Sequence, residues 1–281
     1  MLGAIAGDII GSAYEFTRQK RYDFEMVSPG SRFTDDTVMT LAVAHWLCLY
    51  IEEDHPKEKL IETMQKYGRE YPFAGYGSSF NSWLWSENPK PYNSWGNGAA
   101  MRVSPVGLYA TTLDDALDLA KRTAEVSHNH PAGITGAQAV AASVWMAIHG
   151  HSKDEIRDYI QCRFNYDLTR TVDEIRPAYQ WDGSCQGSVP ESIICFLEGK
   201  DFEDVVRLAV SLGGDADTMA CIAGSIAACI YPIPEWIGNK CVEVLPAQLL
   251  SESLHFEKFS SLVRFLDRLP YIYGLFKNKC E

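Results

Sequence analysis

Two short acidic clusters lie far apart in the chain, and each is followed directly by an apolar run with helical spacing. They read Thr34-Asp35-Asp36-Thr37 and Asp215-Ala216-Asp217-Thr218. Four carboxylates gathered in one cleft would repel each other strongly where the dielectric constant is low, and a multivalent cation would be needed to join them. The fold must therefore either keep the two clusters apart or bring them together around metal.

Helix capping is the simpler explanation of each cluster taken alone, because Thr and Asp before a helix accept hydrogen bonds from its first N–H groups. The pair Gly213-Gly214 precedes Asp215 and favours the metal alternative. Glycines let the backbone turn sharply and approach a bound group closely, which capping does not require. Carboxylate and hydroxyl oxygens suit Mg²⁺, Mn²⁺ or Ca²⁺ rather than zinc, and two ions about 4 Å apart are within their reach.

Helical spacing of apolar residues extends over most of the chain, and alternating strand patterns are scarce. The expected helices cover residues 37–51, 113–126, 132–149, 189–197, 202–212, 218–230 and 259–269. No linker rich in Pro, Ser, Gly or charge divides the 281 residues. The sequence therefore predicts an all-α fold, a compact single domain of many helices over residues 1–281.

Small residues recur at four-residue steps in two of the helical stretches. They are Gly3, Gly7 and Gly11 in the first, and Ala220, Gly224 and Ala228 in the second. Such rows let helix backbones approach closely. Asp8 and Glu15 stand out near the first row, because a carboxylate on a helix of small apolar residues is costly to bury unpaired. Glu15 is expected to need water or a cation.

The charge and cysteine content narrow the possible partners and location. The net charge of −12 and the absence of a basic stripe argue against sequence-specific binding of nucleic acid. The eight cysteines include no CxxC pair and are expected to be reduced. The N-terminus has no basic signal, and the longest apolar run, 219–231, is too short to span a bilayer. We expect a cytoplasmic monomer that does not enter a membrane.

Three further segments have the composition of ligand contacts. Residues 71–95 break the helical pattern and concentrate aromatic rings, which more often plug a core but can stack on a nucleobase or ribose, and Tyr76 is the candidate contact among them. The turn 96–102 is rich in small residues and can present consecutive N–H groups to a pyrophosphate. In the segment 127–131, we expect His128 to be a hydrogen-bonding group facing a ligand rather than a metal ligand.

Taken together, these motifs resemble those of the ADP-ribosylglycohydrolase family, in the family's order along most of the chain. The matching segments are Gly7-Asp8-Ile9-Ile10-Gly11 with Glu15, Thr34-Asp35-Asp36-Thr37, Gly96-Asn97-Gly98-Ala99-Ala100-Met101-Arg102, Ser127-His128-Asn129-His130-Pro131, Gln186-Gly187-Ser188-Val189-Pro190-Glu191 and Gly213-Gly214-Asp215-Ala216-Asp217-Thr218. The doubled acidic motif with its glycine pair is the most specific of them. No family motif falls after about residue 245.

The resemblance implies an all-α fold around a binuclear Mg²⁺ or Mn²⁺ centre that cleaves the glycosidic bond at C1″ of ADP-ribose. Matched position by position, the implied metal ligands are Thr34, Asp35, Asp36, Asp215, Asp217 and Thr218, with Glu15 beside the metals. The implied contacts of the diphosphate and distal ribose are Gly96, Asn97, Gly98 and Ala99, and His128 reaches the same pocket.

Hydrolysis of a ribosyl bond needs an activated water and stabilisation of the positive charge that develops on the sugar. We therefore expect Asp36 and Asp217 to hold the metals in the catalytic centre and Glu15 or a nearby Asp to move protons, with a metal ligand or a gate as the alternative roles of Glu15. Two alternatives are a binuclear-metal phosphoesterase and a non-catalytic ADP-ribose-binding protein. The sequence does not indicate whether the group attached to ADP-ribose is arginine, serine, an acetyl ester or a nucleobase.

Overall fold

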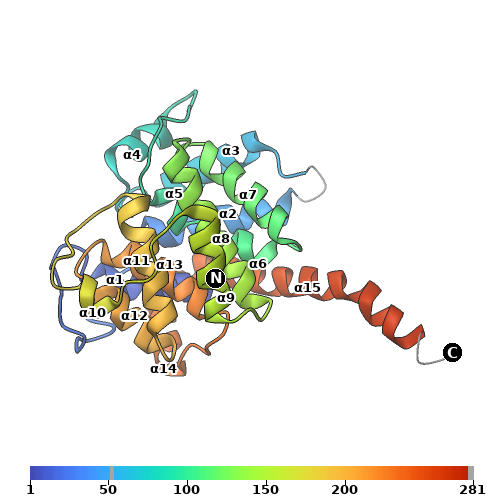
Figure 1. Cartoon of the computed structure of the whole chain (residues 1–281). Helices are drawn as coiled ribbons and strands as arrows, with labels where there is room; N and C mark the ends of the chain where they lie inside the picture. Colours follow the sequence, from blue (N-terminus) through green and yellow to red (C-terminus); the bar gives the residue numbers. More distant parts are fainter. Residues whose placement is uncertain (51–53, 278–281) are drawn as a thin grey trace.

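The computed structural model describes residues 1–50 and 54–277, with side chains as far as residue 264. Within this part the protein is all-α, as predicted, and its one β-bridge joins Gly96 to Ser184 (Figure 1). The helices are α1 (Leu2–Ser12), α2 (Asp35–Leu49), α3 (Lys57–Glu70), α4 (Ser78–Trp85), α5 (Gly98–Met101), α6 (Ser104–Tyr109), α7 (Leu113–Glu125), α8 (Pro131–Ile148), α9 (Lys153–Phe164), α10 (Val172–Ile175), α11 (Cys185–Glu198), α12 (Phe202–Ser211), α13 (Ala216–Ala227), α14 (Glu235–Val244) and α15 (Ala247–Lys277).

Most predicted helices are present with small shifts at their ends. The expected helix 37–51 corresponds to α2, and its last predicted residue, Ile51, lies outside the described residues. The segment 71–95 was expected to break the helical pattern, but it contains α4, because Phe80, Trp83 and Leu84 recur at helical spacing and are buried together. All the cysteines among the described residues are free thiols, as predicted.

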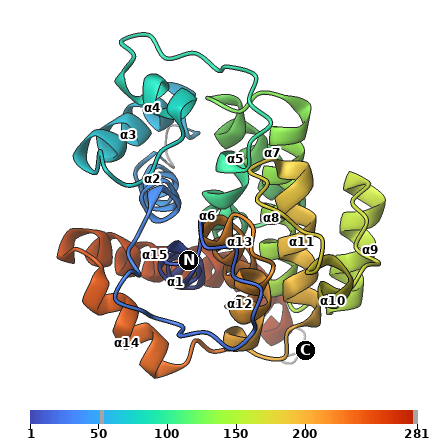
Figure 2. The ribbon, with the colours of Figure 1, turned by 90° about the vertical axis from the view of Figure 1, so that its left-hand side faces the viewer.

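The closest helix pair, α1 and α13, lies at the centre of the molecule (Figure 2). A Cβ built on Gly7 would lie 2.0 Å from the carbonyl oxygen of Ala220, and one built on Gly11 would lie 2.3 Å from that of Ala216. Gly3 meets Gly224 in the same way, so the two helices run antiparallel. This confirms the prediction that the small residues allow close backbone contact. It also brings the end of α1 against the start of α13.

Helix α8 has the length and apolarity of a membrane span, which the sequence analysis did not notice. Length and composition alone do not distinguish such a span from the core helix of a soluble protein. In this fold 61% of the helix is buried inside the protein, and α8 packs against α5, α6, α7 and α11. Its apolar composition is therefore accounted for by the hydrophobic core of the described part of the chain.

Candidate active site

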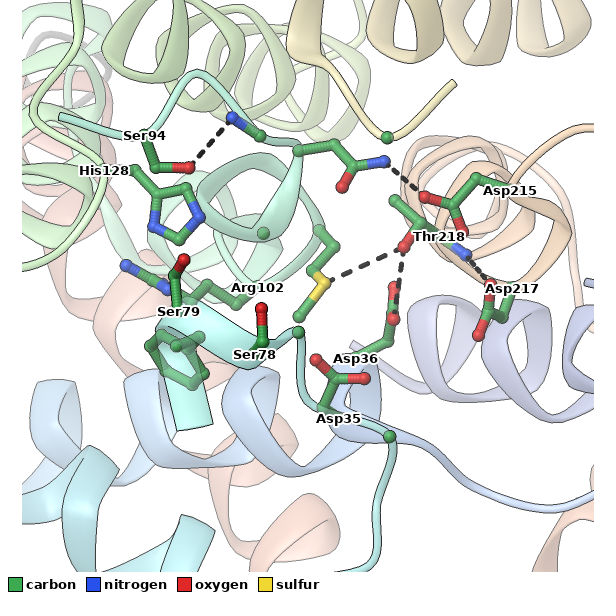
Figure 3. A pocket seen from close by; sticks show the side chains of 18 of the residues that line it. Asp35, Asp36, Ser78, Ser79, Ser94, Arg102, His128, Asp215, Asp217 and Thr218 are labelled. Atoms are coloured by element: carbon green, nitrogen blue, oxygen red, sulfur yellow. Dashed lines mark hydrogen bonds between the residues drawn. The ribbon is translucent and has the colours of Figure 1, made fainter. Parts of the chain in front are cut away.

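The two acidic clusters meet at the N-termini of α2 and α13, which confirms that they are neighbours in space. The Thr218 hydroxyl donates to Asp36 Oδ2 at 3.3 Å, although the two residues come from different clusters. Figure 3 shows the side chains of Asp35 and Asp36 facing those of Asp215 and Asp217 across a short gap. The first requirement of the metal hypothesis is thus met by the fold.

Helix capping explains part of the first cluster and little of the second. Thr34 is the N-cap of α2, and its hydroxyl accepts from the Asp36 N–H at 3.2 Å. Asp215 occupies the N-cap position of α13, but its side chain makes no capping hydrogen bond. Its carboxylate accepts instead from the Asn97 side-chain amide at 2.8 Å. The backbone before it turns at Gly213, with φ of +66°, as the glycine pair predicted.

Asp8 on α1 fastens the start of α2 to the centre of the molecule. The Thr34 N–H and hydroxyl donate to its carboxylate at 2.9 and 2.7 Å, and the Thr37 N–H donates at 3.1 Å together with the Thr37 hydroxyl. Asp8 is fully buried. This carboxylate was expected to be costly to bury, but it was not predicted to lie in the site. Its role depends on how α1 packs against α2, which no local pattern reveals.

The carboxylates form two overlapping groups that are suited to a pair of cations. Oxygens of Asp8, Asp36 and Asp217 lie within 4.8 Å of one another, and so do oxygens of Glu15, Asp215 and Asp217. Asp217 belongs to both groups. Glu15, in the turn after α1, reaches this place because α1 runs antiparallel to α13.

The electrostatics of the cluster are unfavourable without positive charge. Burial raises the pKa values of Asp36 and Asp217 well above the usual range, and the neighbouring carboxylates raise them further. The same causes raise the pKa of Glu15 to about 8, against a smaller opposing effect of Arg32. Burial also raises the pKa of Asp215 to about 6, although the Asn97 amide stabilises its charged form.

Hard divalent cations fit this set of oxygens. The buried Oδ1 of Asp36 has no hydrogen-bond partner among the described residues, and such an atom is costly unless something binds it. The neighbouring atoms that could coordinate a metal are all oxygens, which Mg²⁺ and Mn²⁺ prefer as ligands. The predicted ligands at 34–36 and 215–218 lie together, and the structure adds Asp8 beside them.

A cavity of about 610 Å³ leads from the carboxylates to the glycine turn. Asn97 connects the two ends, because its amide donates both to Asp215 and to the Ser188 hydroxyl, at 3.2 Å. Ser188 belongs to the predicted motif 186–191, which thus acts as a support for the turn. The N–H groups of Gly98 and Ala99, at the start of α5, have no acceptor within the described part of the chain.

The far end of the cavity is built around His128, as the sequence analysis predicted. A Cβ on Gly98 would lie 3.0 Å from His128 Nε2, so a larger residue at position 98 would crowd this ring. The rings of Phe80 and Tyr92 flank His128 with centroids 6.3 and 5.5 Å away. Arg102, which is only 1% exposed, is the single Lys or Arg among the described residues that line the cavity.

Two predicted ligand contacts do not line the cavity. Ala99 is fully buried and is not part of the cavity wall. Tyr76 packs against Phe80, and its hydroxyl has no partner among the described residues. The remaining predicted contacts, Gly96, Asn97, Gly98 and His128, lie in the wall. Arg102 and the exposed ring of Trp181 also lie there and were not predicted as site residues.

Comparisons with known proteins agree with this arrangement. The ADP-ribosylglycohydrolase family model matches residues 1–263. ADP-ribosylhydrolase ARH3 from Homo sapiens is 26% identical, with 91% of each chain covered. ADP-ribosylarginine hydrolase Tri1 from Pseudomonas putida is 22% identical, with 97% of this chain and 78% of the relative covered.

A solved structure described as an ADP-ribosylglycohydrolase-related protein complex has the same fold, with a TM-score of 0.64 and 24% identity over 95% of this chain and 96% of the other. The family match extends over both acidic clusters, the glycine turn and His128. The chain therefore belongs to the ADP-ribosylglycohydrolase family.

Proposed function

We propose that this protein is a metal-dependent hydrolase that cleaves the bond at C1″ of ADP-ribose and so removes ADP-ribose from a modified protein side chain or small molecule. Family membership makes the chain a glycosidic-bond hydrolase, as expected. The observation that carries the finer proposal is the single cavity that joins a crowded carboxylate cluster to an end rich in hydrogen-bond donors. These two ends suit a ribose with its reacting carbon and a diphosphate, respectively.

Two Mg²⁺ or Mn²⁺ ions would be held by Thr34, Asp35, Asp36, Asp215, Asp217 and Thr218, and bound there they would lower the pKa of a water and fix the ribose hydroxyls. Asp8 holds Thr34 and Thr37 in position, and therefore the ligands between them. The Asn97 amide does the same for Asp215.

Glu15 is the residue best placed to move a proton. It is partly buried, it lies within 4.8 Å of Asp215 and Asp217, and it lines the cavity. In the metal-free protein, burial and the neighbouring carboxylate of Asp217 raise its pKa to about 8. A protonated carboxyl can donate to the leaving group and accept a proton from the attacking water afterwards.

The donor end would bind the diphosphate without a lysine. The free N–H group of Gly98 and the ring of His128 lie along one wall, and Arg102 adds positive charge there. Preorganised donors of this kind bind anionic oxygens with little reorganisation. Aromatic rings nearby, among them Tyr92 and Trp95, offer faces on which a nucleobase can stack.

The test is a panel of ADP-ribosylated arginine, ADP-ribosylated serine and O-acetyl-ADP-ribose, each incubated with the protein and either Mg²⁺ or Mn²⁺. We expect intact ADP-ribose as the product from at least one of them, detected by chromatography and mass spectrometry. The names of the two relatives, an ADP-ribosylhydrolase and an ADP-ribosylarginine hydrolase, make arginine one of the first substrates to try.

The products separate this proposal from its alternatives. AMP or ribose phosphate in place of ADP-ribose would identify a phosphoesterase, and binding of ADP-ribose without turnover of any substrate would identify a binding protein. Turnover that persists in excess chelator would contradict the metal requirement. The monomeric state and the cytoplasmic location stay predictions of the sequence.

A further inference from the structure

The guanidinium of Arg102 is buried, and among the described residues it has no carboxylate partner. One of its nitrogens, Nη2, donates to the Thr123 carbonyl at 2.9 Å and to the Ser127 hydroxyl at 2.8 Å. The Nε atom has no partner in the described part of the chain. A buried charge without an ionic partner is costly, so the arrangement needs an explanation beyond packing.

The Ser127 hydroxyl connects Arg102 to His128. Its oxygen lies 2.8 Å from His128 Nδ1, and Ser127 is fully buried. The other ring nitrogen, Nε2, faces the glycine turn, where it is the atom nearest to a Cβ built on Gly98. No described residue hydrogen-bonds to Nε2, and His128 lines the cavity. This nitrogen is therefore open to a ligand.

Arg102 determines the direction of the hydrogen bonds that link Arg102, Ser127 and His128. A guanidinium can only donate, so the Ser127 oxygen accepts from Arg102. The hydroxyl has one hydrogen, and His128 Nδ1 is the acceptor within reach. If Nδ1 carried the ring proton instead, it would donate to Ser127, and the buried hydroxyl hydrogen would have no acceptor among the described residues. Leaving a buried donor unsatisfied costs about 1 to 3 kcal/mol.

We propose that Arg102, acting through Ser127, is a positioning residue that holds His128 as the neutral tautomer with its proton on Nε2, where it donates a hydrogen bond to an acceptor oxygen of the ligand. The tautomer follows from the described residues alone, whereas the assignment of the acceptor to a diphosphate rests on the proposed function. Burial and the charge of Arg102 lower the pKa of His128 well below its usual value, which is consistent with a neutral ring.

The direct test is the protonation pattern of His128 in the full-length, metal-loaded protein. Two-bond ¹H–¹⁵N spectra of protein labelled on histidine nitrogen distinguish the Nε2–H tautomer, the Nδ1–H tautomer and the doubly protonated ring. The signals are assigned by their absence in His128→Gln. We expect the Nε2–H pattern at neutral pH without ligand. An Nδ1–H or doubly protonated ring would overturn the proposal.

Ser127→Ala tests whether the relay sets the tautomer. The substitution removes the hydroxyl but leaves the backbone bond from the Tyr92 N–H to the Ser127 carbonyl. We expect the nitrogen signals of His128 to move toward those of mixed tautomers and the Kd for ADP-ribose to rise roughly twofold to threefold, because only part of the population then has the donor in place. The matched control is Ser143→Ala, an equally buried serine on α8 whose hydroxyl bonds to the Ala139 carbonyl.

Arg102→Gln gives a second, independent perturbation, because an amide can accept as well as donate and so lets the Ser127 hydroxyl turn round. We expect the same mixing of tautomers, with circular dichroism confirming the fold. Unchanged His128 signals in both Ser127→Ala and Arg102→Gln would refute the positioning role. If wild-type protein does not bind ADP-ribose, the proposed function fails while the spectra still decide the tautomer.

Discussion

The two ends of the cavity satisfy their polar groups in opposite ways. At the carboxylate end, Asp36 and Asp217 are buried among like charges, and an oxygen of Asp36 has no partner among the described residues. At the donor end, Asn97 and Arg102 each donate to protein acceptors, and His128 is held by Ser127. The donor end is therefore held largely by hydrogen bonds within the protein, although Arg102 Nε is unpaired among the described residues, whereas the carboxylate end would be compensated by the proposed cations.

This difference predicts that the two ends respond differently to the same kind of change. Neutralising a carboxylate should affect metal binding first and substrate contacts only as a consequence. Changing the donor end should weaken ligand binding modestly and leave metal binding intact.

Asp217→Asn should have the largest effect, because Asp217 belongs to both carboxylate groups. We expect metal binding to be lost in calorimetric titration and turnover to fall more than about a hundredfold. Asp36→Asn should behave similarly, and the helical circular dichroism should survive in both. Asp158→Asn, at an exposed position on α9, is the matched control. Full activity in either site variant would rule out the two-ion scheme.

Glu15→Gln should separate chemistry from metal binding. Glutamine keeps the size of the side chain but cannot give up a proton, so we expect kcat to fall about a hundredfold or more while metal affinity changes little. If Glu15 transfers a proton, its titration produces one limb of the pH profile of kcat, and this limb should be missing in the variant. If both kcat and its pH profile match the wild type, Glu15 has no part in proton transfer.

Asp8→Asn should weaken the carboxylate end indirectly. The amide is the same size as the carboxylate, but its NH₂ group cannot accept hydrogen bonds. The bonds that Thr34 or Thr37 donate to the replaced oxygen are therefore lost. Supporting residues of this kind change metal affinity by about tenfold to a hundredfold. We expect a loss within that range by calorimetry, with little change in ADP-ribose affinity once metal is saturating. Wild-type metal affinity would show that α2 holds its position without Asp8.

The extent to which the sequence predicted this site differs between the two ends as well. Asp35, Asp36, Asp215 and Asp217 were predicted as candidate metal ligands. They could be recognised because each acidic cluster is short and directly precedes a helical run. The spacing of small residues predicted close helix packing but not the partners; the structure pairs α1 with α13, and this contact explains why Glu15 reaches the cluster. Each of these features lies within one short segment, so the pattern of residues in that segment is enough to predict it.

The features that were missed depend on contacts between distant segments. Asp8 matters because the start of α2 packs across the middle of α1. Arg102 was part of a recognised motif, but its role depends on the approach of Ser127 from the loop after α7. Tyr76 was selected by composition alone. In the fold its ring packs against Phe80, and Tyr76 is not among the residues that line the cavity. Spacing along the sequence does not encode these directions.

The smallest expected effect is the pH dependence of stability in the metal-free protein. The folded-state pKa of Glu15 is about 8, above its ordinary value of 4.5, and that of Asp217 is also raised. Between pH 4.5 and about pH 8, Glu15 is protonated in the folded protein but ionised in the unfolded chain, so the folded protein binds more protons. The contribution of Glu15 to stability is therefore complete below about pH 4.5 and is lost as the pH rises through about 8.

We therefore expect the Tm of chelator-treated protein to fall by a few degrees between about pH 5 and about pH 9. Saturating Mg²⁺ should suppress the fall, because the ions favour the charged carboxylates of the folded state, and Glu15→Gln should reduce it. Glu155 and Glu174, whose pKa values are lowered by hydrogen bonds from Ser152 and Thr171, contribute in the opposite sense and below this range. A metal-free Tm that rises with pH over the same interval would mean that the carboxylate end is already compensated without cations, and the contrast between the two ends would not hold.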